Sequence, residues 1–183
     1  MGAAIETTVT DQDRAFVVAL DDPAAVAVGL TGGKAANLAR AWAGGTDPRE
    51  GEALFTHLRG RGFSQEEAVE AGLVAIGRSA YDRFRGRLLW PIRDASGDTI
   101  GFGARRIHDD DKIDAKYLNT PETPLYKKSQ VLYGIDLARK EIAKRKQAVI
   151  VEGYTDVMAA HLSGVETAVA TCGTSFGSDH ISV

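Results

Sequence analysis

Hydrophobic residues recur along this 183-residue chain at spacings that change near residue 46 and again near residue 147. Before the first change, an apolar run at 15–20 predicts a strand and an alanine-rich stretch at 35–43 predicts a helix. Residues 44–48 contain two glycines and a proline, which break the pattern. We therefore divide the chain into a separate N-terminal segment at 1–45, a middle part at 46–146 and a C-terminal part at 147–183.

The middle part is predicted to begin with two helices. Residues 51–61 place apolar side chains at helical spacing on one face. Ser64 and Glu67 form a capping box that opens a second, short helix ending at Gly72.

A β-hairpin is predicted after these helices. Apolar runs at 87–93 and 99–105 flank a turn of five residues rich in Asp, Ser and Gly. Residues 108–128 are polar, contain two prolines and are interpreted as an irregular loop.

The C-terminal part has the pattern of a β-α-β unit that follows a helix at 134–146. Strands are expected at 148–152 and 167–172, with a helix at 155–163 between them. The first strand is rich in β-branched residues and is expected to be buried in a parallel sheet. The predicted fold class is therefore α/β, an α+β part with a hairpin followed by a parallel α/β unit.

Composition adds three constraints. The chain is 44% hydrophobic and 26% charged, with no apolar run approaching the roughly 20 residues of a membrane span. It has one cysteine and no Cys/His zinc spacing, so we expect a cytoplasmic protein with no membrane contact and no zinc in this chain. Residues 51–150 carry 18 basic and 14 acidic side chains, whereas residues 151–183 carry none and four. The basic middle part is the place to look for an anionic ligand.

Glu152 is the first candidate functional residue, because it ends the predicted strand 148–152. Ligands of open α/β sheets gather at the carboxyl ends of the strands. A carboxylate there is placed to hold a divalent cation that also meets phosphate oxygens. Gly153 would let a substrate or metal approach the backbone, and Asp156 would support the site one helical turn later. The alternative is a surface carboxylate that ends a strand.

A group of arginines is the second candidate. Its members are Arg83, Arg85, Arg87, Arg93, Arg105 and Arg106. In strand geometry Arg85 and Arg87 share a face, and Arg105 is expected near them across the hairpin. Like charges on neighbouring strands repel unless an anion lies between them, so we favour a phosphate-binding row. The alternative is a solvated sheet edge with protective charges.

Two further segments are candidates for binding. Lys116, Tyr117, Asn119 and Lys128 lie in a proline-stiffened stretch whose lysines, aromatics and amides suit a single nucleic-acid strand, although an ordinary surface loop has the same composition. The motif Gly32-Gly33-Lys34 is a weak phosphate-binding candidate at a predicted helix start, without the spacing of a Walker loop.

From about residue 54 to residue 183 the chain resembles the catalytic core of the bacterial replicative DNA primases. The matching strings are HLRGRGF at 57–63, DRFRGR at 82–87, PIRD at 91–94, GFGAR at 101–105, KYLNTPET at 116–123 and VEGYTD at 151–156. The resemblance implies a small mixed subdomain with a basic groove at 46–146, followed by an incomplete Toprim domain at 147–183. The aspartates of the Toprim D-x-D motif are expected beyond residue 183.

The resemblance also implies an activity and its partners. Members of the family are DNA-directed RNA polymerases, nucleotidyltransferases that synthesise short RNA primers on single-stranded DNA from ribonucleoside triphosphates with Mg²⁺ or Mn²⁺. A replicative helicase and a single-strand-binding protein are their partners, and the helicase-interaction domain is not expected in this chain.

The same resemblance assigns roles to individual residues. Glu152 matches the Toprim glutamate, a metal-site residue and proposed general base. The groove that receives template and nucleotide phosphates is matched by Arg83, Arg85, Arg105 and Lys116, while Tyr117, Asn119 and Lys128 fall in the adjoining motif. Because a single carboxylate is a poor Mg²⁺ site, we expect this chain by itself not to prime.

Other interpretations stay open. The chain could be a non-catalytic fragment that binds single-stranded DNA through the basic groove. Residues 27–38 resemble the start of the nucleotide-binding domain of phosphoenolpyruvate synthase and pyruvate phosphate dikinase, which would imply an ATP-dependent phosphotransferase and a 1–45 segment of other origin. A sheet with an exposed strand edge could also fold poorly.

Overall fold

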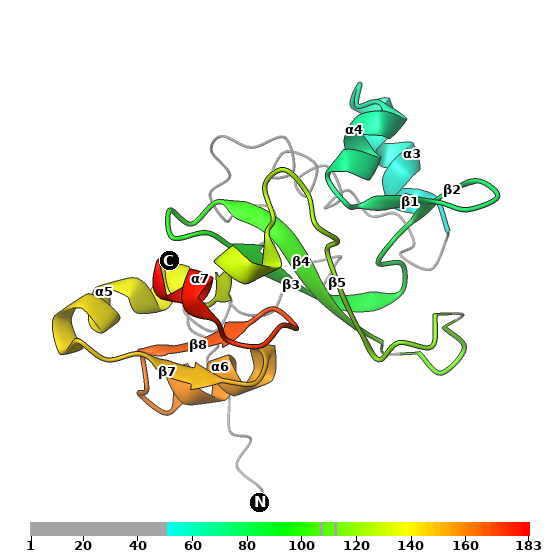
Figure 1. Cartoon of the computed structure of the whole chain (residues 1–183). Coiled ribbons are helices and arrows are strands. Elements are labelled where there is room, and N and C mark those ends of the chain that lie inside the picture. Colours follow the sequence, from blue (N-terminus) through cyan, green and yellow to red (C-terminus); the bar gives the residue numbers. More distant parts are fainter. Residues whose placement is uncertain (1–50, 107, 112) are drawn as a thin grey trace, which may run out of the picture.

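The computed structural model describes residues 51–106, 108–111 and 113–183, and these form three successive groups of elements (Figure 1). A helical lobe comes first, a three-stranded sheet lies in the middle, and an α/β lobe follows. The strand predicted at 15–20, the helix at 35–43 and the motif Gly32-Gly33-Lys34 lie outside the described residues.

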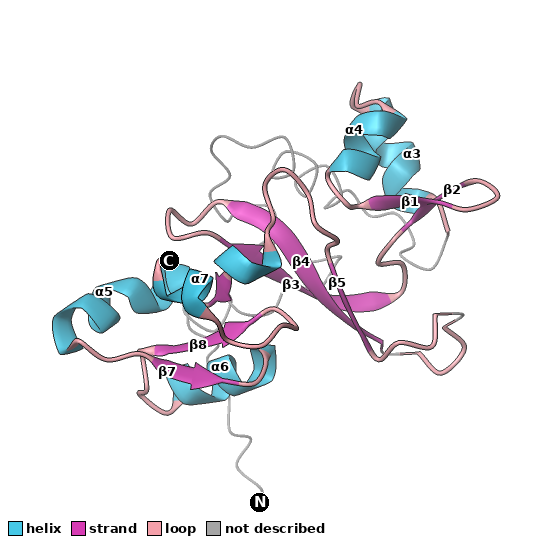
Figure 2. Cartoon of the chain, viewed as in Figure 1, coloured by secondary structure: helices cyan, strands magenta, loops and turns pink. Residues whose placement is uncertain are grey.

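The helical lobe confirms the two predicted helices (Figure 2). Its elements are α3 (Ala53–Gly60), α4 (Gln65–Glu70), β1 (Val74–Ile76) and β2 (Ala80–Asp82). The predicted capping box is present, since the Glu67 N–H donates to Ser64 Oγ at 3.1 Å and the Ser64 N–H donates to the Glu67 carboxylate at 3.0 Å. The short antiparallel pair β1–β2 was not predicted, because three-residue strands are too brief to show an alternation.

The start of α3 is capped by a residue distant in sequence. Asp82, at the end of β2, is 2% exposed and accepts the backbone N–H groups of Leu54 at 2.7 Å and Phe55 at 2.9 Å. Glu52, the residue at the N-cap position, makes no capping hydrogen bond. Asp82 therefore satisfies two N–H groups that a helix start leaves without partners.

We expect Asp82→Ala to lower the free energy of unfolding by about 1–3 kcal/mol, because two buried N–H groups lose their acceptor. Urea unfolding followed by circular dichroism measures this difference. The matched control is Asp98→Ala, which removes a carboxylate from the hairpin turn and should change stability less. An unchanged midpoint for Asp82→Ala would contradict the capping role.

The same carboxyl group predicts a pH dependence. Burial raises the pKa of Asp82 above its ordinary value of 3.8, and this outweighs the two N–H groups, which lower it. The folded chain holds this proton more tightly than the unfolded chain, so the contribution to stability is complete below pH 3.8 and is lost as the pH rises through the raised pKa. Relative to Asp82→Asn, the unsubstituted chain should lose stability across that range.

The predicted hairpin is confirmed as β3 (Arg87–Arg93) and β4 (Thr99–Arg106), which pair antiparallel. A third strand, β5 (Tyr117–Asn119), pairs antiparallel with the other side of β4. The prediction of an irregular loop over 108–128 is therefore wrong at its centre, where three residues form an edge strand.

The two faces of this sheet pack against different cores. Residues opposite one another in an antiparallel pair share a face, and alternate residues share it along a strand. One face carries Leu89, Phe102 and Ala104 and packs on the helical lobe. The other carries Trp90 and Gly103 and packs on the α/β lobe. The middle sheet therefore separates the helical lobe from the α/β lobe.

The register of the hairpin corrects the predicted row of arginines. Arg87 lies opposite Arg106, and Arg105 lies opposite Leu88 and Tyr117. Arg87 and Arg105 consequently lie on opposite faces of the sheet. Arg85 precedes β3, in the turn after β2, so it does not share a strand face with Arg87.

The α/β lobe contains the predicted β-α-β unit. Its elements are η2 (Lys128–Gln130), β6 (Leu132–Tyr133), α5 (Ile135–Arg145), β7 (Val149–Val151), α6 (Tyr154–Leu162), β8 (Ala168–Thr171) and α7 (Ser178–Ile181). The strand order is β6-β8-β7, with β7 parallel and β6 antiparallel to β8. Helix α5 packs against Val169 on one face, and α6 packs against Ala170 through Val157 on the other.

The parallel pairing of β7 and β8 is confirmed, but the expected burial of β7 is wrong. Within the described sheet β7 is an edge strand, and Ile150 is 40% exposed. The buried strand is β8, in which Ala168, Val169 and Ala170 are each 0% exposed and only Thr171 is partly exposed. None of the described helices has the length and apolar character needed to cross a membrane.

Candidate functional site

A pocket of about 300 Å³ lies where β5 meets the beginning of α6 and the end of β8. Its lining residues are Tyr117, Asn119, Glu152, Gly153, Tyr154, Thr155, Asp156, Thr171 and Gly173. Both parallel strands, β7 and β8, end at this pocket, as expected for the carboxyl edge of an α/β sheet. The pocket therefore joins residues from the middle sheet and from the α/β lobe.

Glu152 and Asp156 supply two carboxylates to the pocket, and both side chains are exposed. Asp156 Oδ2 accepts the backbone N–H of Gly153 at 3.0 Å, which fixes the turn between β7 and α6. Gly153 has an extended backbone that any residue can adopt, and an added Cβ would meet only Asp156 Oδ2, at an ordinary contact distance of 3.8 Å. The glycine therefore leaves open space beside Glu152 and is not required by the fold itself.

Asn119 connects the middle sheet to the α/β lobe with both ends of its amide. Its Nδ2 donates to the carbonyl oxygen of Cys172 at 2.9 Å, and its Oδ1 accepts the hydroxyl of Tyr154 at 2.8 Å. The nitrogen and the oxygen of the Asn119 side-chain amide thus both have hydrogen-bond partners within the protein. The bonds hold β5 against the pocket, which Tyr117 and Glu152 both line.

Tyr154 is the centre of this connection. Its ring stacks on Trp90 at 5.4 Å between centroids and meets Tyr133 edge-on at 4.7 Å. The ring also fills the space over Gly103, where a Cβ would have no room. Burial raises the pKa of the Tyr154 hydroxyl, so it stays protonated and donates to Asn119.

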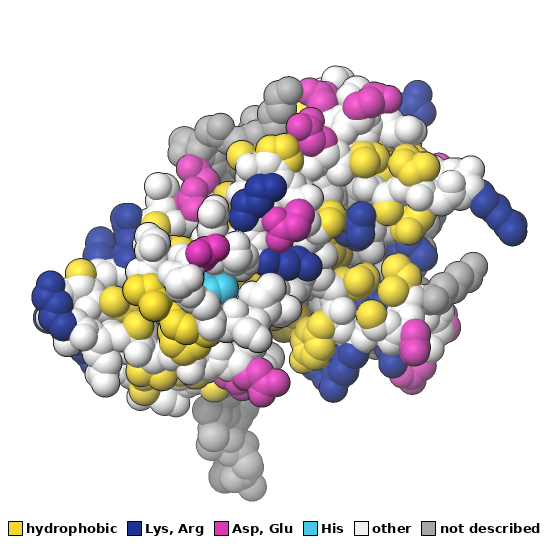
Figure 3. Space-filling view, viewed as in Figure 1, with side chains coloured by type: hydrophobic (Ala, Val, Ile, Leu, Met, Phe, Trp, Pro, Cys, Tyr) yellow, Lys and Arg dark blue, Asp and Glu magenta, His cyan; other side chains and the backbone are white. Residues whose placement is uncertain are grey.

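None of the predicted basic residues lines the pocket. Lys116 is exposed, with its ammonium 5.9 Å from the centre of the Tyr117 ring, and Arg105 is the partner of Tyr117 in the strand register. Figure 3 shows Lys and Arg side chains across the part of this face that covers the middle sheet, with acidic side chains between them. The surface is therefore mixed in charge.

Arg83 and Arg85 lie in the turn between β2 and β3, and both are half-buried. Arg85 donates to the carbonyl oxygen of Asp82 at 3.2 Å and lies 4.9 Å above the ring of Tyr81. These contacts hold the guanidinium of Arg85 against β2.

Lys128 begins η2, and its backbone is held at two points. Its N–H donates to Glu122 Oε1 at 3.0 Å, and its carbonyl oxygen contacts His180 Nε2 at 3.0 Å. Burial raises the pKa of the Cys172 thiol, and the ammonium of Lys128 acts in the opposite direction.

Two of the predicted arginines are structural. Arg87 is 1% exposed and pairs with Asp111, with Arg87 Nη2 2.8 Å from Asp111 Oδ2. Arg93 is 7% exposed and pairs with Asp136 at 3.5 Å. The expectation that Arg87 binds nucleic acid is corrected by this burial, because its guanidinium is enclosed by protein groups.

Comparison with known proteins agrees with this architecture. The family model for the DNA primase catalytic core, N-terminal domain, matches residues 32–139. This chain belongs to the DNA primase catalytic core family. The model of a Toprim domain matches residues 146–183 of the same primase chain. The primase match begins before the boundary that we placed at residue 45, so residues 32–45, with Gly32, Gly33 and Lys34, lie inside it.

Curated primases are similar to this chain over most of its length. It is 61% identical over 140 residues to the DNA primase of Streptomyces coelicolor and 44% identical over 141 residues to that of Synechococcus elongatus. These alignments cover 76% and 75% of this chain and 22% and 20% of the two relatives. The chain thus spans about a fifth of the length of these primases.

Solved primase structures share the fold. The RNA polymerase domain of the Mycobacterium tuberculosis primase is 57% identical, with a TM-score of 0.71, over 80% of this chain and 48% of that one. A primase catalytic domain bound to single-stranded DNA is 41% identical, with a TM-score of 0.60, over 68% of this chain and 39% of that one.

Sequence reasoning missed four pocket residues of this primase chain. They are Tyr154, Thr155, Thr171 and Gly173. Thr171 and Gly173 come at the end of β8, the second parallel strand, so the rule that pointed to Glu152 at the end of β7 points to them as well. Tyr154 lies within the string VEGYTD, but its partners Asn119 and Trp90 come from another part of the sequence.

The donor set of the primase pocket suits a hard divalent cation. Glu152 and Asp156 offer carboxylate oxygens, and Mg²⁺ in nucleotide sites is commonly held by one or two carboxylates together with phosphate oxygens and water. In the part of the chain that the structure describes, no group of three or more His, Cys, Asp or Glu side chains gathers at one point. The pocket therefore fits a cation that a bound phosphate helps to hold.

Proposed function

We propose that this chain supplies template and nucleotide contacts, and one of the metal-binding carboxylates, to a primase that makes RNA primers on single-stranded DNA. The observation that carries the proposal is the shared pocket. Tyr117 and Asn119 from the middle sheet line it together with Glu152 and Asp156 from the α/β lobe.

The template would lie along the face that presents Lys116 and Tyr117. Lys116 is exposed and Tyr117 is 47% exposed, so an ammonium and an aromatic ring are both open to a ligand. A single nucleic-acid strand is bound by this combination, because lysine neutralises phosphate and an aromatic ring stacks on any base. Arg105, beside Tyr117, and Arg83 and Arg85, in the β2–β3 turn, would extend the contacts to further phosphates.

Glu152, supported by Asp156, would hold Mg²⁺ or Mn²⁺ in the pocket. When bound, the cation would neutralise charge on the phosphates while a 3′-hydroxyl attacks the α-phosphate of a ribonucleoside triphosphate and pyrophosphate leaves. Glu152 is the better placed of the two carboxylates to bind it, because Asp156 already accepts the Gly153 N–H.

The proposed partners of the whole primase are a replicative helicase and a single-strand-binding protein.

The proposal is tested by titrating a fluorescent oligo(dT) with the chain at several salt concentrations. Lys116→Ala is expected to weaken binding and to reduce the slope of log K against log salt by about 0.7, the share of one phosphate contact on a single strand. The control is Lys140→Ala, which removes an exposed lysine from α5 in the other lobe. It should leave the slope closer to that of the unsubstituted chain.

Failure of the unsubstituted chain to bind oligo(dT) at low salt would refute the proposal. Binding that Lys116→Ala and Lys140→Ala weaken equally would show non-specific attraction, and would remove the argument for a template path beside Tyr117. The same titration is repeated with added Mn²⁺. If Mn²⁺ leaves the affinity for oligo(dT) unchanged, the alternative of a non-catalytic module that binds single-stranded DNA is favoured.

A further inference from the structure

Arg87 lies outside the proposed site, on the face of the middle sheet opposite Arg105 and Tyr117. Its side chain is almost fully buried, with 1% exposed. A buried guanidinium is retained only where protein groups replace its lost water, because desolvation of a charge is costly. The groups that do so for Arg87 all belong to one segment.

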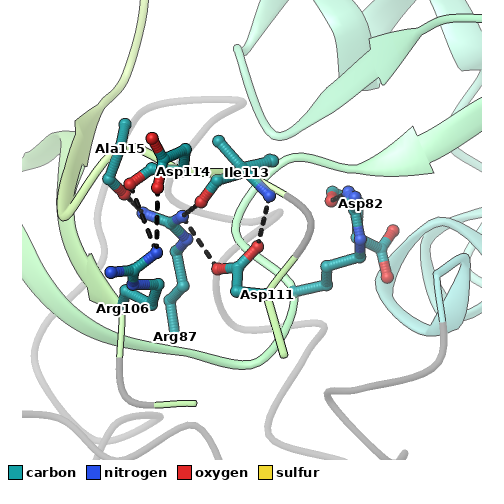
Figure 4. A network of polar contacts seen from close by, with 8 residues as sticks. Asp82, Arg87, Arg106, Asp111, Ile113, Asp114 and Ala115 are labelled. Atoms are coloured by element: carbon teal, nitrogen blue, oxygen red, sulfur yellow. Dashed lines mark hydrogen bonds and ion pairs between the residues drawn. The ribbon is translucent and has the colours of Figure 1, made fainter. Parts of the chain in front are cut away.

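The described residues of that segment are 111 and 113–115, and they lead into β5 (Figure 4). Arg87 Nη1 donates to the carbonyl oxygen of Ala115 at 2.8 Å, and Nη2 donates to that of Ile113 at 2.9 Å. Nη2 also lies 2.8 Å from Asp111 Oδ2. One side chain thus binds the segment at three residues.

Asp111 strengthens the arrangement from the other side. Its Oδ1 accepts the backbone N–H of Ile113 at 2.8 Å while its Oδ2 pairs with Arg87. The Asp111 side chain is only 8% exposed, so the pair is shielded from solvent. A pair shielded from solvent is much less screened by salt than a surface pair.

The segment ends where the proposed template contacts begin. Ala115, whose carbonyl oxygen binds Arg87, immediately precedes Lys116 and Tyr117. The carbonyl oxygen of Lys116 then accepts the backbone N–H of Arg106 at 2.9 Å, and Tyr117 pairs with Arg105. The position of Lys116 is therefore set on one side by the strand ladder and on the other by Arg87.

We infer that Arg87 is a positioning residue for template binding: with Asp111 it fixes Ile113 and Ala115 so that Lys116 and Tyr117 enter β5 facing the template. Arg87 itself does not touch the nucleic acid. The inference rests on the proposed function, because it concerns the residues through which single-stranded DNA would be bound.

The sign of one charge change tests the inference. Asp111→Asn keeps an oxygen for the Ile113 N–H but removes the negative charge that pairs with Arg87. If only net charge mattered, loss of an acidic group would strengthen binding of oligo(dT). The positioning role predicts the reverse, a weakening by about three- to tenfold, a range typical of residues that act through their neighbours. The matched control is Asp109→Asn, an equal charge change at an exposed residue two positions before Asp111.

A double-substitution experiment separates positioning from direct contact. Arg87→Lys should weaken oligo(dT) binding in the unsubstituted chain but have almost no further effect once Lys116 and Tyr117 are both replaced by Ala. Thermal unfolding of each variant verifies that it is folded. Arg87→Lys is used in place of Arg87→Ala because it keeps the positive charge at this buried position.

Three results would have different meanings. Equal strengthening by Asp111→Asn and Asp109→Asn, or additive effects of Arg87→Lys with the Lys116 and Tyr117 substitutions, would overturn the positioning role. Absence of binding by the unsubstituted chain would instead refute the proposed function. Weakening by Asp111→Asn alone, together with non-additivity, is the result that we expect.

Discussion

Gly103→Ala is expected to lower the free energy of unfolding by about 3 kcal/mol, the upper part of the range for overpacking a core. An added Cβ would lie within 2.4–2.6 Å of three atoms of the Tyr154 side chain, including its hydroxyl oxygen. The ring cannot move aside easily, because it stacks on Trp90, meets Tyr133 edge-on and is hydrogen-bonded to Asn119.

Urea unfolding measures this effect, and Gly60→Ala is the control. Gly60 lies at the end of α3 with no atom within 4 Å of an added Cβ, so alanine there should be neutral or stabilising. Gly103→Ala should also change the near-ultraviolet circular dichroism, which reports on the Trp90–Tyr154 stack. If the two glycine variants were equally stable, the packing of Tyr154 over β4 would be wrong.

Glu152→Gln is expected to weaken Mn²⁺ binding by at least about tenfold. Replacing a residue that only hydrogen-bonds to a metal ligand already lowers metal affinity by about that factor, and Glu152 would be a direct ligand. The amide keeps the size of the side chain but removes its charge. Binding should be weak in the chain alone and stronger with a ribonucleoside triphosphate, since phosphate oxygens complete the ligand set.

Electron paramagnetic resonance of free Mn²⁺ measures this binding directly. Glu70→Gln is the control, an equal charge change at an exposed residue at the end of α4, on the helical lobe. A Glu152→Gln variant that binds Mn²⁺ as well as Glu70→Gln does would remove the metal from the proposed function, while leaving DNA binding intact.

Much of the fold could be predicted because its longer elements show a clear period. The hairpin β3–β4, the helix α5 and the β7-α6-β8 unit all follow the spacing of their apolar residues. The strand β5 could not be found in this way. It is three residues long, lies among prolines and lysines, and is a strand only because β4 offers it a free edge.

The faces of the hairpin were beyond sequence reasoning for a related reason. Alternation along β3 shows that Arg87 and Leu88 point to different faces of the sheet. It does not show which residues of β4 pair with them. Pairing shifts by one residue between Ile92 and Arg93, so the register depends on an irregularity close to the turn. Without this register, the sequence places Arg87 among the binding residues.

The candidate site was predictable in part. Position at the end of a strand selected Glu152, and the same rule extended to β8 reaches Thr171 and Gly173. Asn119 was expected to contact nucleic acid, whereas both ends of its amide bind Tyr154 and Cys172. Such connections between distant segments depend on the tertiary structure, and no local pattern reveals them.

The central claim is that a single nucleic-acid strand and the carboxylate pocket share one surface. The most direct measurement is the change in backbone amide chemical shifts when oligo(dT) is added to isotope-labelled chain. We predict that the amides of Tyr117, Asn119, Gly153 and Asp156 shift together, while those of α5 do not. Shifts confined to the helical lobe, or shifts at β5 without any at residues 152–156, would contradict the account.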